Sequence, residues 1–193
     1  MQDSLIFTVS DVSGKGIPAA LFMMRAKATL KNYIVSGDDL NIAIEKVNED
    51  LCKNNDTDMF VTSWIGSLNL KTGLLQFVNA GHNYPLIKKN NEFSYLNTRP
   101  NFVLAGMEGC HYKVHEVQLN PGDELFLYTD GVTEACNNEN ELYGDNRLLE
   151  ALNEQGSLKV KERCMNVSES VEAFVQNAPQ SDDITMMCIQ FFG

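Results

Sequence analysis

The sequence LIFTVSDVSGKGIPAAL, residues 5–21, combines three local signals that decide how the chain begins to fold. Residues 5–10 are apolar and β-branched, which predicts a buried strand, and this run stops at Asp11. The Gly-Lys-Gly that follows predicts a tight turn, and a proline then suits the first turn of a helix expected over residues 17–35. The stretch therefore predicts a strand that delivers a carboxylate to a glycine turn directly before a helix.

The Gly-Lys-Gly at residues 14–16 does not have the pattern of a nucleotide-binding loop. The G-x-x-x-x-G-K-[ST] pattern is absent here, because Lys15 is followed by glycine, and the G-x-G-x-x-G pattern is absent as well. Glycine lets a backbone carbonyl approach a metal ion closely. We therefore interpret this turn as part of a metal site rather than as a phosphate cradle.

The remainder of the chain predicts two helices, a block of strands, two more helices and a final strand. The first helix is expected to bury a stripe made of Leu21, Met24, Ala28 and Leu30, and the second a stripe made of Leu40, Ile44, Val47 and Leu51. The second helix is expected over residues 39–53, and two later helices over 146–155 and 158–177. Strands are expected within residues 59–70, 73–81, 84–89, 92–97, 112–119, 124–129 and 184–192. This order favours an α+β fold with antiparallel sheets over a doubly wound parallel sheet.

The composition limits the classes of partner. The formal net charge is -11 and the sequence pI is about 4.6, so the surface should repel nucleic acid and anionic membranes. No apolar run approaches the roughly 20 residues that span a bilayer. The 5 cysteines are odd in number and include no C-x-x-C pair, which favours reduced thiols. We therefore expect one cytoplasmic domain without nucleic-acid or membrane partners.

Aspartates stand at the ends of three apolar strands. Asp130 follows the strand LFLYT, whereas Asp182 and Asp183 precede the last strand, and Asp11 ends the first. If these strand ends converge, the carboxylates need a cation between them, and oxygen ligands suit Mg²⁺, Mn²⁺ or Ca²⁺ rather than Zn²⁺. The alternative is that aspartate is simply common in turns and at strand ends.

Several blocks of sequence occur in an order that resembles a known enzyme family. They are DVSGKGIPAALFM (11–23), VNAGHNYPL (78–86), LFLYTDGVTEACN (125–137), ELYG (141–144) and SDDITMM (181–187). Together they resemble the PPM-type metal-dependent serine/threonine protein phosphatases, in the bacterial subgroup typified by RsbU and SpoIIE. The resemblance covers nearly the whole chain.

The resemblance implies a fold and a set of metal ligands. The fold is a four-layer αββα sandwich, in which two antiparallel sheets are flanked by helices and a two-metal site lies at one end. The implied catalytic and metal-binding residues are Asp11, the Val12 carbonyl, Asp130 and Asp182. Secondary candidates are Asp183, Gly131 and His82. For His82 we favour a structural role, with Asn79 fixing its turn, over a catalytic one.

The implied activity is hydrolysis of phosphoserine or phosphothreonine on a regulatory protein. Two Mn²⁺ or Mg²⁺ ions would activate a water molecule for direct attack on phosphorus. The implied substrate is a phosphorylated anti-sigma-factor antagonist of the STAS type. Two alternatives stay open: a catalytically inactive PPM-like module that binds a partner or transmits a signal, and a Ca²⁺-stabilised structural domain. The resemblance is compatible with a homodimer and does not decide the oligomeric state.

One departure from the family pattern concerns the start of the chain. The family carries a GGDFYD-like motif on a strand before the first block, and its aspartate ligates the second metal. Residues 1–10 hold only Asp3. We therefore expect a single domain, 1–193, that is N-terminally truncated, lacks the family's first strand and binds fewer ions, and whose activity as a fragment is in doubt. We also expect an upstream sensor or regulatory domain outside this chain, acting on the helices within residues 17–53.

Overall fold

The computed structural model describes residues 3–154 and 159–193, which divide into two compact units. Unit 1 consists of Met1–His82 and Thr98–Gln118, and unit 2 of Asn83–Asn97 and Leu119–Gly193. The predicted helix end at residue 155 and helix start at residue 158 lie outside the described residues.

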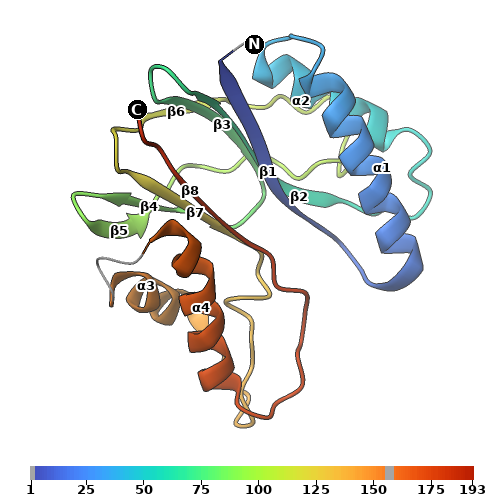
Figure 1. The fold of residues 1–193 in the computed structure, drawn as a ribbon. Coiled ribbons are helices and arrows are strands. Elements are labelled where there is room, and N and C mark those ends of the chain that lie inside the picture. The colour runs from blue at the N-terminus through green and yellow to red at the C-terminus, as the bar shows by residue number, and fades with distance from the viewer. Residues whose placement is uncertain (1–2, 155–158) are drawn as a thin grey trace. The chain divides into compact units, whose positions relative to one another are not determined.

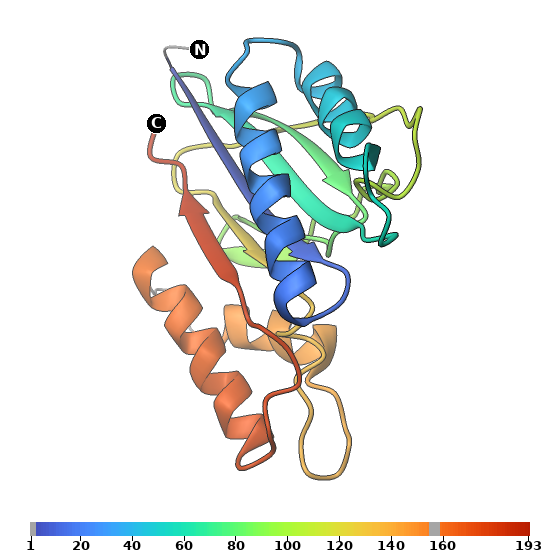
Figure 2. The same cartoon turned by 90° about the vertical axis from the view of Figure 1, so that its right-hand side faces the viewer.

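Unit 1 is an antiparallel sheet with two helices on one face (Figure 1). Its elements are β1 (Ser4–Val12), α1 (Gly16–Ile34), α2 (Leu40–Cys52), β2 (Val61–Asn69), β3 (Leu74–Ala80) and β6 (His115–Gln118). The strands are ordered β1-β2-β3-β6 and all neighbouring pairs are antiparallel. Figure 2 shows α1 running in front of this sheet.

The core of unit 1 lies between the helices and the sheet. Phe22, Ala26 and Leu30 of α1 pack with Ile44 of α2 and Ile65 of β2. The predicted stripe of α2 is confirmed at Ile44, Val47 and Leu51, which are fully buried.

The predicted buried stripe of α1 is wrong except at Leu30. Leu21 and Met24 are 62% and 69% exposed, and Ala28 is exposed as well. The helix is apolar on more than one side, so its periodicity does not select the buried face. The face that packs on the sheet begins at Phe22, one residue away from the predicted stripe.

The other face of this sheet carries a row of stacked rings. Phe7, Trp64, Phe77 and His115 come from the four strands in order, with successive ring centroids 5.8, 4.9 and 5.5 Å apart. Cross-strand aromatic neighbours of this kind stabilise one register, because a slip of one residue moves every ring to the opposite face. The row therefore fixes the strand alignment that places Asp11 opposite Thr62.

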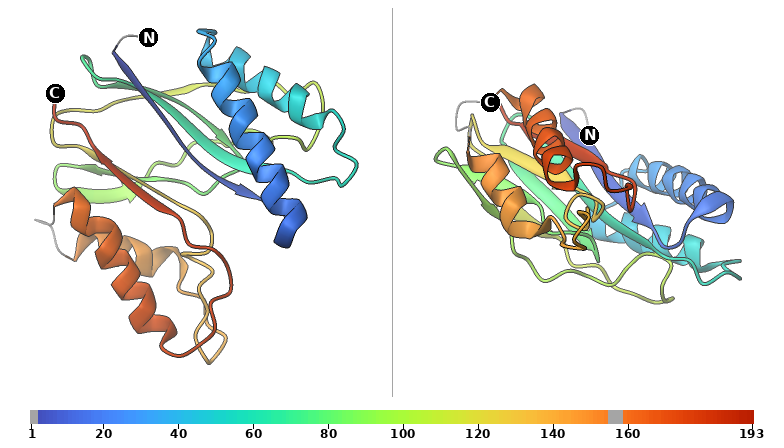
Figure 3. Two further views of the ribbon diagram at one scale, coloured as in Figure 1. Left: turned by 45° about the vertical axis from the view of Figure 1, so that its right-hand side comes forward. Right: turned by 90° about the horizontal axis from the view of Figure 1, so that it is seen from below.

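Unit 2 repeats the same plan with different elements. They are β4 (Leu86–Lys89), β5 (Glu92–Tyr95), β7 (Glu124–Tyr128), α3 (Gly144–Asn153), α4 (Val160–Val175) and β8 (Met186–Gln190). The sheet order is β5-β4-β7-β8, again antiparallel throughout. The two helices lie together on this sheet (Figure 3), and Leu148, Leu152 and Val167 pack against Phe93 and Phe126.

A buried ion network crosses the interior of unit 2. The Glu124 carboxylate of β7 accepts hydrogen bonds from Lys88 Nζ at 2.9 Å and from Arg163 Nε at 3.0 Å. The side chains of Glu124 and Arg163 are 2% and 1% exposed. Because buried charges are tolerated only when paired, this network ties β4, β7 and α4 together.

The predicted fold class is confirmed, with two antiparallel sheets that each carry a pair of helices. All predicted helices and strands are present, and their described ends differ from prediction by a few residues. Among the described residues, no helix is long and apolar enough to cross a membrane.

Candidate metal centre

Asp11 lies in unit 1, near the end of edge strand β1. It is paired with Thr62, and the strand continues for one residue to Val12, opposite Val61. The Ser13 N–H donates to the Phe60 carbonyl at 2.9 Å, which extends the pairing past Asp11. The residues before and after Asp11 are therefore paired with the neighbouring strand, so the aspartate is not in a loose loop.

The turn after this strand requires glycine for its backbone conformation. Gly14 and Gly16 have φ values of +89° and +81°, which side chains with a Cβ rarely adopt. A Cβ atom at either position would meet nothing within 4 Å, so glycine is required here for its backbone conformation and not for lack of space. The predicted tight turn is confirmed, and close approach of a carbonyl to a metal stays a prediction.

His82 is buried in the turn that follows β3. The Asn79 side chain accepts from the His82 N–H at 2.7 Å and donates to the His82 carbonyl at 3.0 Å. These bonds support the predicted structural role of this residue pair. His82 Nδ1 also lies 2.9 Å from the Thr62 hydroxyl, which donates to the Asp11 carbonyl at 3.4 Å. His82 thus helps to position the Asp11 backbone through Thr62.

Asp130 and Asp182 lie on two segments of unit 2. Hydrogen bonds between residues close to these aspartates join the two segments. The Thr129 N–H donates to the Thr185 carbonyl at 3.0 Å, and the Thr185 N–H donates to the Thr129 hydroxyl at 2.9 Å. The same hydroxyl donates to the Asp183 carbonyl at 3.2 Å. Thr129 therefore joins the segment that carries Asp130 to the segment that carries Asp182 and Asp183.

Gly131 makes the close approach of these two segments possible. A Cβ atom at this position would lie 2.3 Å from the Asp183 carbonyl oxygen and 3.0 Å from its carbonyl carbon. Distances this short are not tolerated between Cβ and backbone atoms. Gly131 is a secondary site candidate in the sequence, and the structure gives it a positioning role.

Gly131→Ala is expected to lower stability by about 1–3 kcal/mol, because the added methyl group overpacks against backbone that cannot rotate away. The substitution should also displace Asp182 and Asp183 and so weaken divalent-ion binding. Urea denaturation and Mn²⁺ titration measure the two effects. Asn138→Ala, at an exposed position of the loop that follows, is the control, and equal stability of Gly131→Ala and the wild type would contradict this role.

Local hydrogen bonds fix the backbones of both aspartates. The Asp130 carbonyl accepts from the Glu134 N–H at 2.7 Å, which closes a tight turn. The Asp182 carbonyl accepts from Gln180 Nε2 at 2.7 Å, and its carboxylate accepts from the Asp183 N–H at 2.8 Å. Asp130 and Asp182 are partly exposed and Asp183 is exposed, so all three carboxylates lie at the surface of the unit.

The predicted ligands are oxygen donors, and they are divided between the two units. Asp11 and Val12 belong to unit 1, whereas Asp130 and Asp182 belong to unit 2. Across residues 3–154 and 159–193 no group of three or more His, Cys, Asp or Glu side chains is placed to hold a metal ion by itself. Carboxylate and carbonyl oxygens are the donors that Mg²⁺ and Mn²⁺ prefer, so the chemistry of the predicted set fits these ions.

Sequence reasoning missed Thr62 and Thr129, and it named Gly131 as a secondary candidate without its positioning role. Thr62 and Thr129 act through hydrogen bonds to segments distant in the chain, and Gly131 acts through a steric contact. Thr129 and Gly131 flank Asp130 in the sequence, which was the available signal, whereas Thr62 reaches Asp11 only through strand pairing.

The family model described as Stage II sporulation protein E (SpoIIE) matches residues 1–192. Phosphoserine phosphatase RsbU of Bacillus subtilis is 28% identical over 191 residues, which cover 98% of this chain and 56% of RsbU. Protein IcfG of Synechocystis is 26% identical over 215 residues, which cover 97% of this chain and 34% of IcfG. The chain therefore spans between a third and little more than half of these curated relatives.

Solved structures show the same fold. The SiaA-PP2C domain of Pseudomonas aeruginosa superimposes with a TM-score of 0.85 at 21% identity, over 99% of this chain and 76% of that one. The catalytic domain of the serine/threonine phosphatase PstP, in complex with 2 manganese ions, gives a TM-score of 0.71 at 14% identity, over 99% and 92% of the two chains. The chain belongs to the SpoIIE family, the RsbU/SpoIIE-like group of PPM-type phosphatases.

Proposed function

We propose that this protein is a Mn²⁺- or Mg²⁺-dependent phosphatase that hydrolyses phosphoserine or phosphothreonine on a regulatory protein. The observation that supports it most is the contact of Gly131 with Asp183, which brings the segments of Asp130 and Asp182 together in unit 2. Membership of the SpoIIE family and the named activity of RsbU support the reaction class.

Asp11, the Val12 carbonyl, Asp130 and Asp182 are the residues that would hold the ions, with Asp183 in a supporting position. When bound, the ions supply Lewis acidity, activation of water and neutralisation of phosphate charge. The chain's own residues orient this set: Thr62 holds the Asp11 backbone, and Thr129 with Gly131 holds the Asp130 and Asp182 backbones. Because the protein carries a net charge of -11, recruited cations also explain how it accepts an anionic substrate.

The proposed substrate is a phosphorylated anti-sigma-factor antagonist of the STAS type. This step rests on the likeness to RsbU, which is named as a phosphoserine phosphatase. The protein class of the substrate can be tested apart from the chemistry, because small phosphate esters report hydrolysis without a protein partner.

Removal of divalent ions is expected to abolish phosphate release by the natural full-length protein, and added Mn²⁺ is expected to restore it. The assay measures inorganic phosphate released from a phosphoserine protein, with and without a chelator. Full activity in the chelator would contradict the metal-dependent reaction. Absence of hydrolysis at every Mn²⁺ concentration would favour the alternative of a non-catalytic signalling module.

We further propose that a regulatory module covers the outer face of α1. This face exposes Ile17, Leu21, Met24 and Val35, which are between 62% and 76% exposed. Exposed apolar stripes of this kind mark interaction surfaces. The greater length of the relatives supports an occupant from the same polypeptide, and α1 follows directly on the Asp11 turn.

The double substitution Leu21→Ser and Met24→Gln tests this surface. Since both side chains are exposed in the chain itself, the stability of residues 1–193 is expected to change by less than about 0.5 kcal/mol. Control of phosphate release by the regulatory module in the full-length protein is expected to be lost. Stability is read by urea denaturation, and a large loss of stability would show that Leu21 and Met24 pack within the chain instead of facing a regulatory module.

A further inference from the structure

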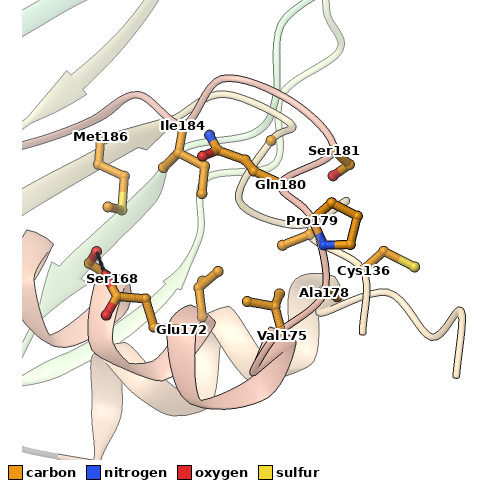
Figure 4. A pocket seen from close by; sticks show the side chains of 13 residues that line it. Cys136, Ser168, Glu172, Val175, Ala178, Pro179, Gln180, Ser181, Ile184 and Met186 are labelled. Carbon is orange, nitrogen blue, oxygen red and sulfur yellow. Dashed lines mark hydrogen bonds between the residues drawn. The ribbon is translucent and has the colours of Figure 1, made fainter. Parts of the chain in front are cut away.

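Unit 2 contains a pocket that the proposed metal chemistry does not use (Figure 4). Its volume is about 360 Å³, within the range of sites that take small ligands or single side chains. Helix α4 forms one wall, the turn after Asp130 forms a second, and residues 178–186 form the third.

The walls of this pocket combine an aliphatic surface with one carboxylate. Val171 and Val175 of α4 and Ile184 and Met186 of the opposite wall supply the apolar surface. Glu172 lies on the same helix face, and its carboxylate accepts a hydrogen bond from the Ser168 hydroxyl at 3.3 Å. The pocket therefore suits a long side chain that has an apolar stem and a polar head.

The electrostatics of the pocket favour a cation as that head. Among the lining residues that the structure describes, Glu172 is the one charged residue, and none is Lys, Arg or His. The C-terminal end of α4 reaches the pocket at Val175, and the last turn of this helix holds no basic residue. The negative end of the helix dipole thus adds to the carboxylate charge.

The pocket lies beside the proposed metal ligands along the chain. Gly131 and Ser181 line it, and they are the immediate sequence neighbours of Asp130 and Asp182. An extended peptide advances about 3.3 Å per residue. A side chain close to the phosphorylated residue of a bound peptide is therefore within reach of the pocket.

We propose that this pocket binds an arginine or lysine side chain of the phosphoprotein substrate, close in sequence to its phosphoserine. The aliphatic stem packs between Val175 and Ile184, and the charged head pairs with Glu172. This inference rests on the proposed phosphatase function and deepens it, because it assigns a sequence preference to the substrate.

The test uses phosphoserine peptides of one neutral sequence, in which a single arginine is moved through the three positions on either side of the phosphoserine. With the full-length protein and Mn²⁺, one position is expected to raise kcat/KM by about fivefold, the scale of an exposed ion pair. Glu172→Gln should remove this gain. Glu169→Gln, which removes the same charge from an exposed site of α4 outside the pocket, should retain it.

A control separates failure of the pocket from failure of the proposed function. Hydrolysis of p-nitrophenyl phosphate by the wild type reports the reaction by itself, because this ester has no peptide side chain. If this ester is hydrolysed but no arginine position raises kcat/KM, or the gain survives in Glu172→Gln, the pocket assignment is wrong.

If neither the ester nor any peptide is hydrolysed, the proposed function fails. Fluorescence anisotropy of the labelled arginine peptides then tests by itself whether the pocket binds an arginine side chain. Tighter binding of one arginine peptide than of the neutral peptide, lost in Glu172→Gln, would support the pocket without catalysis. Equal affinities of the wild type and Glu172→Gln for every arginine peptide would overturn it.

Discussion

Replacing Asp130 with asparagine is expected to lower the kcat/KM for a phosphoserine protein by more than about 100-fold. The substitution keeps the shape of the side chain and removes the negative charge that would hold a divalent ion. Loss of residues that only support metal ligands already costs 10–100-fold, so loss of a ligand should cost more. The fold should survive, because the described hydrogen bonds that fix this turn use the Asp130 carbonyl.

Phosphate release and circular dichroism measure these two expectations on the same protein samples. Glu134→Gln is a matched control, since it removes one carboxylate from the same turn at an exposed position. Activity within about threefold of the wild type in Asp130→Asn would show that this carboxylate holds no catalytic metal.

Replacing Glu124 with glutamine is expected to lower the free energy of unfolding by about 3–5 kcal/mol, the usual cost of removing one partner from a buried ion pair. The carboxylate lies 2.9 Å from Lys88 Nζ, and 3.0 and 3.4 Å from Arg163 Nε and Nη2. A neutral amide withdraws the counter-charge from both cations in an interior where water cannot replace it.

Chemical denaturation followed by far-UV circular dichroism measures this loss. Asp38→Asn provides the comparison, because it breaks the exposed ion pair with Lys46 at 2.7 Å and should leave the denaturation midpoint unchanged. A Glu124→Gln protein as stable as the wild type would mean that the network contributes no net stability.

The apolar pattern of the sequence predicted the helices and strands, but not every buried face. In α2 the apolar residues form one stripe, so Ile44, Val47 and Leu51 could be assigned to the core in advance. In α1 apolar residues occur on several sides, and only contacts with the sheet decide that Phe22 is buried and Leu21 is not. Local sequence cannot supply such tertiary information.

The candidate ligands could be found from the sequence because each aspartate follows or precedes an apolar strand. The positioning roles of Thr62, Thr129 and Gly131 could not, since the role of Gly131, for example, depends on a carbonyl more than fifty residues away in the chain. Glu124 is a similar case, because a glutamate after a turn predicts an exposed side chain and only the fold brings Lys88 and Arg163 to it.

The central claim is that Asp11, Asp130 and Asp182 are each required for a metal-dependent phosphatase reaction. The most direct test is phosphate release from a phosphoserine protein as Mn²⁺ is raised, for the wild type, Asp11→Asn in unit 1 and Asp182→Asn in unit 2. The account predicts that each substitution lowers release by more than about 100-fold at Mn²⁺ concentrations that saturate the wild type. Wild-type rates and Mn²⁺ dependence in both variants would contradict it.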